Sequence, residues 1–190
     1  AVNYYDNYRF TEGWYADFFL GLNPPTTDNA RGRLSGSAVL TSNGGRLGCI
    51  ISYDQQGNVL EIQKKGLDGS VDLVTNTYTY TNQLASSKSM VKIEKGDTLK
   101  FEEHNTYSTT TDRLVAITRQ AFLNAFPSKM NKCTYTYDRL GRLVAIDRPI
   151  NRNKGKINYE YNIQSWTQKI NSDSFNESIH YVDGQGKPMY

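Results

Sequence analysis

The sequence predicts an all-β protein in which consecutive antiparallel hairpins form one continuous, coiled or curved sheet. Three observations support this fold class: short segments with strand periodicity follow one another, turn residues separate them, and one hairpin pattern recurs. The clearest hairpin is residues 133–147, CTYTYDRLGRLVAID. Apolar and polar residues alternate on both sides of its turn, and Gly141 stands where a turn can require positive φ.

The same pattern recurs at residues 53–62. In both hairpins an Asp follows the Tyr directly, and a Gly follows it by four residues. Weaker copies contain Tyr78 and Tyr80, Tyr107, and Tyr159 and Tyr161. The anchors Tyr53, Tyr80, Tyr107, Tyr137 and Tyr161 are 27, 27, 30 and 24 residues apart. Spacings of about 20 to 50 residues indicate a repeat architecture.

The segment before the first strong repeat is rich in aromatic residues. Residues 4–10 have strand character, and residues 14–20 fit either a strand or a helical turn. Pro24 and Pro25 exclude a central strand from the connection that follows. The turn Asn43-Gly44-Gly45 predicts a hairpin between residues 31–40 and 46–52.

Further along, residues 71–81 and 98–102 alternate as strands do. Residues 118–126 fit a helical turn that Pro127 would end. From residue 132 onward the sequence predicts hairpin after hairpin. We therefore predict a single repeat segment over residues 1–190, with divergent strands over 1–48 and repeats over 49–190.

Composition and charge limit the classes of function. The chain has 190 residues, 37% of them hydrophobic, and its mean hydropathy of −0.64 suits a thin sheet with one wet face. No run approaches the roughly 20 apolar residues of a membrane span. The net charge of +3, without a Lys/Arg stripe and interleaved aromatic residues, predicts no nucleic-acid partner.

The residue pattern predicts no cofactor, metal or catalytic site. Cys49 and Cys133 lack the spacing of zinc ligands, and we interpret them as small buried hydrophobes at matching places in two repeats. His104 and His180 are isolated imidazoles, and no nucleophile-elbow or metal-binding helix motif accompanies them. We therefore expect that the chain is not an enzyme.

Each residue of the recurring unit has a physical role in stacking repeats. Tyr135 and Tyr137 place two rings on one face of a strand about 7 Å apart, where rings of successive hairpins can pack together. Asp138 can accept hydrogen bonds from turn amides. Arg142 can extend over the next repeat, to stack or to pair with an Asp. None of these roles is chemistry on a substrate.

The unit Tyr-x-Tyr-Asp-x-x-Gly-Arg-Leu at residues 135–143 resembles the YD repeat of the Rhs (rearrangement hotspot) and teneurin-like family. Tyr53, Asp54 and Gly57 fit the same consensus. The opening Tyr4-Tyr5-Asp6-Asn7-Tyr8 and residues 159–171 are similar to large Rhs-like surface proteins of Bacteroidetes. The copies at Tyr80 and Tyr107 lack the Asp and the Gly, which leaves their turn geometry open.

The resemblance implies a β-sheet coiled into a hollow shell, in proteins that are secreted or associated with the bacterial cell surface or wall. Many family members enclose a toxin, and some repeats are proposed to bind carbohydrate. The family's self-cleaving core carries an Asp-Pro motif, which this sequence lacks. We therefore transfer neither protease nor toxin activity to this chain.

These observations predict a non-enzymatic scaffold segment whose main partner is the rest of its own long chain. A carbohydrate-binding surface module is the alternative, with Trp14 and Trp166 as the rings that would stack on surface glycans. A glycosidase is a third hypothesis, and it would need two convergent carboxylates about 5–10 Å apart. Unpaired backbone groups on the terminal strands also predict edge-to-edge dimers.

Overall fold

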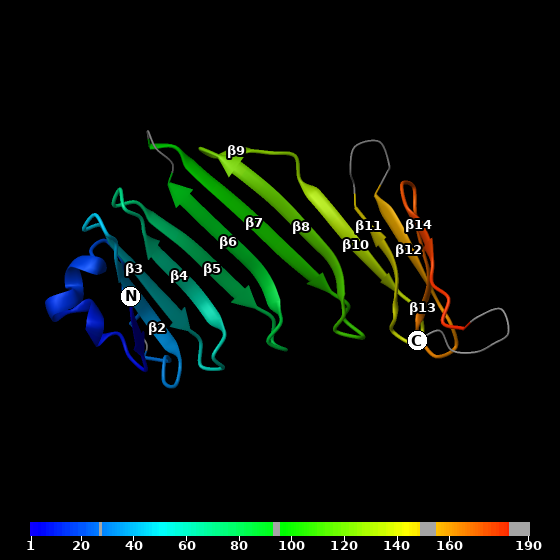
Figure 1. Cartoon of the computed structure of the whole chain (residues 1–190), viewed down its shortest axis with the longest axis horizontal. Coiled ribbons are helices and arrows are strands. Elements are labelled where there is room, and N and C mark those ends of the chain that lie inside the picture. Colours follow the sequence, from blue (N-terminus) through cyan, green and yellow to red (C-terminus); the bar gives the residue numbers. More distant parts are fainter. Residues whose placement is uncertain (27, 93–95, 149–154, 183–190) are drawn as a thin grey trace. The chain divides into compact units, whose positions relative to one another are not determined.

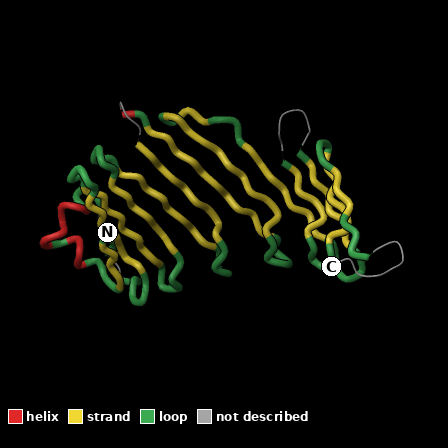
Figure 2. Tube along the Cα trace, viewed as in Figure 1, coloured by secondary structure: helices red, strands yellow, loops and turns green. Residues whose placement is uncertain are grey.

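A computed structural model describes residues 1–26, 28–92, 96–148 and 155–182 of the chain. These residues form antiparallel strands, with short 3-10 helices in the N-terminal segment (Figures 1 and 2). The elements are β1 (Val2–Tyr5), η1 (Arg9–Thr11), η2 (Gly13–Phe18), β2 (Leu34–Leu40), β3 (Arg46–Tyr53), β4 (Val59–Lys65), β5 (Val71–Tyr78), β6 (Leu84–Lys92), β7 (Thr98–Tyr107), β8 (Leu114–Leu123), β9 (Phe126–Pro127), β10 (Asn131–Tyr137), β11 (Leu143–Asp147), β12 (Lys156–Tyr161), β13 (Thr167–Ser172) and β14 (Asn176–Ser178).

The strand order follows the chain order. Hydrogen-bonded neighbours run from β1 to β8 and then from β10 to β14, while the short β9 pairs with β8. Consecutive strands pair antiparallel, as in β3 with β4 and β12 with β13. The predicted all-β class, built from consecutive hairpins, is confirmed.

Two compact units divide the chain. The first consists of Ala1–His104 and Arg119–Met130, and the second of Asn105–Thr118 and Asn131–Tyr190. The first unit holds β1 to β6 in full, and the second holds β10 to β14. Most of the paired strands are joined by short turns, whereas β1 and β2 are joined by residues 6–33.

The hairpin predicted at Asn43-Gly44-Gly45 is present between β2 and β3. Leu40 pairs with Arg46, and the Thr41 N–H donates to the Gly45 carbonyl at 2.9 Å. Gly44 has φ of 81°, in the left-handed region that a residue without Cβ enters at little cost. The turn is therefore explained by its local sequence.

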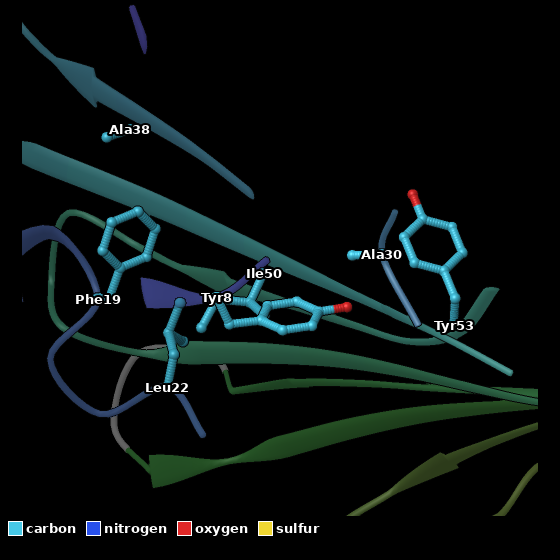
Figure 3. Packing of buried hydrophobic residues seen from close by; sticks show 7 residues of the cluster. All are labelled: Tyr8, Phe19, Leu22, Ala30, Ala38, Ile50 and Tyr53. Atoms are coloured by element: carbon cyan, nitrogen blue, oxygen red, sulfur yellow. The ribbon is translucent and has the colours of Figure 1, made fainter. Parts of the chain in front are cut away.

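The buried core of the first unit lies where the N-terminal segment packs on β2 and β3. Figure 3 shows its members. They are Tyr8, Phe19, Leu22, Ala30, Ala38, Ile50 and Tyr53. Burying a side chain such as that of Ile50, which is 1% exposed, stabilises the fold by about 1.5–3 kcal/mol. Burial also raises the pKa of Tyr8 to about 12, so this hydroxyl stays neutral and can donate.

Two local expectations need correction. Residues 118–126 are not a helical turn, because β8 continues to Leu123 and pairs there with Phe126 of β9. Strand pairing outweighs an ambiguous local period here, and the turn between β8 and β9 places Asn124 and Ala125 at positive φ. Residues 4–10 are a strand only as far as Tyr5, because Asp6 leaves the extended region with φ of 71°.

The helical alternative for residues 14–20 is the one that the structure contains, as the 3-10 helix η2. Among the described residues, no helix has the length and apolar character that a membrane crossing requires.

Candidate functional site: the contact between repeats

A tyrosine that ends a strand, or in the last case lies three residues beyond one, reaches the preceding repeat with its hydroxyl. Tyr53 ends β3 and donates to the carbonyl of Leu34, the first residue of β2, at 2.7 Å. The contact recurs in both units with the same geometry. The further pairs are Tyr78 to Val59 at 2.9 Å, Tyr137 to Leu114 at 2.9 Å, Tyr161 to Leu143 at 2.7 Å, and Tyr181 to Thr167 at 2.9 Å.

In each pair the acceptor is the first residue of a strand. The strand register shifts at the tyrosine itself, for example between Thr136 and Tyr137 and between Glu160 and Tyr161. Such a bulge locally interrupts the ladder and redirects a side chain. A bulge at the strand end therefore goes together with a tyrosine that bonds to another repeat.

The turn after the tyrosine is closed by the aspartate of the unit. The Asp138 carboxylate accepts hydrogen bonds from the backbone N–H groups of Leu140 and Arg142, both at 2.9 Å. The Gly141 N–H donates to the Asp138 carbonyl at 3.0 Å, and Gly141 has φ of 83°. The pattern is a turn ending in a left-handed residue, which is typical of hairpins with a bulge. Asp54 and Gly57 form the same turn.

The turn persists in the repeats that lack Asp and Gly. Asn82 and Ser165 take the left-handed position with φ of 61° and 65°, and Asp112, with φ of 53°, takes it in a turn that is one residue longer. The side chains of Thr79 and Asn162 replace the carboxylate and accept turn N–H groups. Asn and Asp tolerate this conformation better than other residues with a Cβ, which explains why the geometry survives their substitution for Gly.

Arginine covers the ring of the tyrosine in the next repeat. Arg142 lies with its guanidinium 4.9 Å from the centre of the Tyr161 ring, and its Nε donates to the Asp138 carboxylate at 2.7 Å. Arg33 covers Tyr53 at 5.6 Å, and Arg113 covers Tyr137 at 5.8 Å. The predicted reach of this arginine over the neighbouring repeat is observed, and such cation–π contacts stabilise by about 0.5–1 kcal/mol at exposed sites.

The arginine gives the turn glycine a second reason to lack a side chain. A Cβ on Gly57 would overlap the Arg33 guanidinium, and one on Gly141 would overlap that of Arg113. Where Ser165 replaces the glycine, its hydroxyl lies 3.3 Å from Nη1 of Arg142 and accepts its hydrogen bond. The residue at this position is thus matched to the arginine of the preceding repeat.

Trp166 occupies the place of the arginine in the last described repeat. It precedes Thr167, as Arg142 precedes Leu143, and its ring lies 4.9 Å from that of Tyr181. The tryptophan proposed for glycan stacking therefore packs on the next tyrosine and remains 47% exposed. Trp14, the other candidate, lies in η2 and is 99% exposed.

Tyr80 is not the anchor of its repeat. Its side chain is fully exposed in the turn after β5, whereas Tyr78 ends the strand and makes the hydroxyl contact. In the other Tyr-x-Tyr pairs the second tyrosine ends the strand, as Tyr137 and Tyr161 do. The pairing of β5 with β6, in which Tyr78 faces Leu84, decides which of the two residues becomes the anchor.

The remaining repeat tyrosines stand at regular places of the sheet. Tyr107 ends β7, Tyr135 pairs with Ile146, and Tyr159 pairs with Ile170. The contact that sequence reasoning missed is that of Arg33. Its signal was the run Gly32-Arg33-Leu34, which repeats the letters of residues 141–143.

The electrostatics of the turn follow from its hydrogen bonds. Burial alone would raise the pKa of Asp138, but hydrogen bonds from the backbone and side chain of Arg142, together with its charge, hold that pKa below the usual range. The pKa of Asp54 is likewise lowered, since hydrogen bonds from Asn58, Gly57 and Gln56 outweigh the effect of burial. Burial raises the pKa of the Tyr53 hydroxyl, against the influence of Arg33.

Within the part of the chain that the structure describes, no three His, Cys, Asp or Glu side chains gather closely enough to hold a metal ion. Cys49 and Cys133 are free thiols of intermediate exposure, and burial raises the pKa of Cys49. A hollow of about 670 Å³ lies on the first unit, between residues 21–26 and strands β4 to β6, and Glu61 is the carboxylate in its lining. Two smaller hollows are lined by Glu102 and by Asp54.

The chain was compared with family models, curated proteins and solved structures. No family model matches the chain, and no curated protein matches it. Among solved structures, a chain of the Tc holotoxin pore of Photorhabdus luminescens is similar over 83% of this chain, with a TM-score of 0.46 and 14% sequence identity. The similar region spans 12% of the length of that chain.

We predict that Tyr78→Phe lowers the free energy of unfolding by about 0.5–1.5 kcal/mol, because the Val59 carbonyl loses its donor while the ring is kept. Urea denaturation followed by circular dichroism measures the change. Tyr80→Phe is the matched control and should leave stability unchanged, since that side chain is fully exposed. Equal losses for both variants would refute the assignment of Tyr78 as anchor.

A second prediction concerns acid. Because the pKa of Asp138 is lowered in the fold, its contribution is present above the unfolded value near 3.9 and is lost as pH falls through the folded value. Asp138→Asn should keep the turn, as Asn162 does, and should flatten the loss of stability below about pH 4. Asp147→Asn, at the end of β11, is the control. An unchanged acid profile for Asp138→Asn would contradict this account.

Proposed function

We propose that this chain is a non-enzymatic scaffold segment of a longer, secreted or cell-surface YD-repeat protein of the Rhs-like type, in which it builds part of a β-shell. The observation that supports the proposal is the recurring contact between repeats. Each anchor tyrosine uses its hydroxyl on a backbone carbonyl of the preceding repeat, as Tyr53 does on Leu34 and Tyr161 on Leu143.

This contact suits growth of a stack in both directions. The acceptor is a backbone carbonyl, which every repeat can offer, and the donor is the tyrosine of the repeat that follows. Repeat arrays gain stability from such nearest-neighbour contacts rather than from one large core. The Asp and Arg side chains of the unit are likewise engaged within the stack, as Asp138 and Arg142 are.

The proposal that the chain lacks catalytic activity rests on the structural contacts that the Asp and Arg side chains of the repeat make, and on the carboxylates that line the hollows. A retaining or inverting glycosidase places two carboxylates on either side of the bond that it breaks. The three hollows described above present one carboxylate each: Glu61, Glu102 and Asp54.

Edge-to-edge association of two copies stays a prediction, and light scattering at high protein concentration measures it.

The scaffold role is tested on the natural polypeptide that contains this chain. We expect electron microscopy to show the strands of flanking repeats continuing the sheet next to β1 or β14, with the same tyrosine-to-carbonyl contact at each step. Protease added to intact cells should degrade the protein. A compact module that ends at β1 and β14, or a protein that added protease cannot reach on intact cells, would overturn the proposal.

Carbohydrate binding remains the second candidate, and the exposure of Trp14 favours it. Exposed aromatic rings can stack on the apolar faces of sugars, and the Trp14 ring is 99% exposed. If the chain is a carbohydrate-binding module, a glycan array should detect binding that Trp14→Ala abolishes. Trp166→Arg is the matched control, because it restores the arginine of the other repeats. No binding by the wild-type chain would remove this candidate.

A further inference from the structure

The N-terminal segment contains the two halves of a repeat turn. β1 ends at Tyr5, β2 begins at Leu34, and these two residues pair across the sheet with a register shift between Tyr4 and Tyr5. The same relation holds in the clearest repeat, where Tyr137 pairs with Leu143 next to a shift between Thr136 and Tyr137. Tyr5 and Leu34 therefore stand at the two ends of a turn of the YD type.

The hydrogen bonds of that turn are also present. The Asp6 N–H donates to the Arg33 carbonyl at 3.2 Å, as the Asp138 N–H donates to the Arg142 carbonyl at 3.0 Å. The Asp6 carboxylate accepts the Gly32 N–H at 2.6 Å. In the ordinary turn the Asp138 carboxylate likewise accepts turn N–H groups.

Gly32 and Arg33 complete the match. Gly32 has φ of 72°, as Gly141 has φ of 83°, and each precedes an Arg-Leu pair. Arg33 covers the ring of Tyr53 in the next repeat, whose hydroxyl bonds to the Leu34 carbonyl. Arg113 and Leu114 hold Tyr137 in the same two ways.

We infer that Tyr5-Asp6 and Gly32-Arg33-Leu34 form one YD repeat, and that residues 7–31 are a module inserted into its turn, whose described residues 7–26 and 28–31 fold as a lid on one face of the sheet. An ordinary turn has two residues at this place, as Gln55 and Gln56 between Asp54 and Gly57. The inference depends on the repeat geometry and not on the scaffold role proposed above.

The inserted residues are attached to the sheet by polar contacts along their length. The Tyr8 hydroxyl donates to the Ile51 carbonyl at 2.8 Å. Asn23 and Gln63 exchange two hydrogen bonds of 2.7 Å, from the Asn23 N–H to the Gln63 side chain and back to the Asn23 carbonyl. Gln63 is 6% exposed, so this reciprocal pair is buried beneath the lid.

Charged groups anchor the lid at its other side. The Asp17 carboxylate pairs with Arg46 of β3 at 3.1 Å, and the Asp17 carbonyl accepts a hydrogen bond from the Lys65 ammonium of β4 at 3.0 Å. The lid thus reaches from β2 to β4 on one face. Most of the buried core comes from it, including Phe19 and Leu22.

The strands under the lid carry residues small enough to admit it. A Cβ on Gly48 of β3 would overlap the Phe18 backbone carbonyl, and one on Gly36 of β2 would overlap the Phe10 ring. Ala38 of β2, two residues after Gly36 and therefore on the same face, is also small and is 3% exposed. Glycine weakens a strand unless another group approaches closely, which is what the lid does here.

Excision of the module tests the inference. A variant in which Gln-Gln replaces residues 7–31 has the turn Tyr5-Asp6-Gln-Gln-Gly32, which copies residues 53–57. We expect it to retain the strand signal in circular dichroism and to bind a hydrophobic dye several-fold more strongly, because the face of Ala38 and Ile50 becomes exposed. A soluble excised chain without the strand signal would overturn the inference.

Point variants of the intact chain keep the test decisive if the excised chain precipitates. Asp6→Ala and Gly32→Ala should each lower the melting temperature by about 2–4 °C, as Asp138→Ala and Gly141→Ala should in the ordinary turn. If the first two variants melt like the wild type while the latter two are destabilised, the segment is no repeat turn and the inference fails.

The lid itself is tested by Gly48→Val, which suits a strand but leaves no room for Phe18. We expect limited proteolysis within residues 19–31 to become at least several-fold faster, with the strand signal retained. Cys49→Val is the matched control, since neighbouring strand residues point to opposite faces. Equal cleavage rates for wild type, Gly48→Val and Cys49→Val would overturn the lid.

Discussion

The hydrogen bond from the anchor tyrosine of one repeat to the first carbonyl of a strand in the preceding repeat is the contact on which this architecture depends. It joins a side chain to the backbone, so the acceptor residue is free to vary: Leu34, Val59 and Thr167 serve equally. The donor cannot vary in the same way, because phenylalanine would keep the ring but lose the bond. This difference between donor and acceptor explains why tyrosine recurs in the repeats of this chain while the residues around it change.

The positions around the tyrosine are adjusted to one another across repeats. The Arg33 guanidinium over the Tyr53 ring leaves no room for a Cβ at Gly57, whereas the Arg142 guanidinium over Tyr161 donates a hydrogen bond to the Ser165 hydroxyl at the same turn position. Where the covering group is Trp166, ring contact with Tyr181 replaces the cation–π contact. The repeat is therefore defined by contacts between neighbouring repeats, and residues other than those of the consensus can make the same contacts.

The N-terminal segment solves a different problem, the burial of a sheet face. In a single sheet whose strands alternate polar and apolar residues, the apolar side chains gather on one face. Another part of the chain must pack on that face to bury those side chains away from water. The described residues of the inserted module, 7–26 and 28–31, provide that cover with aromatic side chains and with the buried pair of Asn23 and Gln63. The strands beneath them contain Gly36 and Gly48. Repeat stacking and core formation thus reside in different parts of the first unit, although they share Tyr53.

The sequence by itself determined the fold class, the hairpin turns at Gly57 and Gly141 and the reach of Arg142, because these follow from interactions between residues close in the chain. Only the tertiary structure decided that Tyr78 and not Tyr80 is the anchor, and that residues 118–123 extend a strand. Both depend on the partner strand, and a local pattern contains no information about which partner will pair. The union of Tyr5-Asp6 with Gly32-Arg33 was hidden for the same reason, since the two halves meet only when the chain folds.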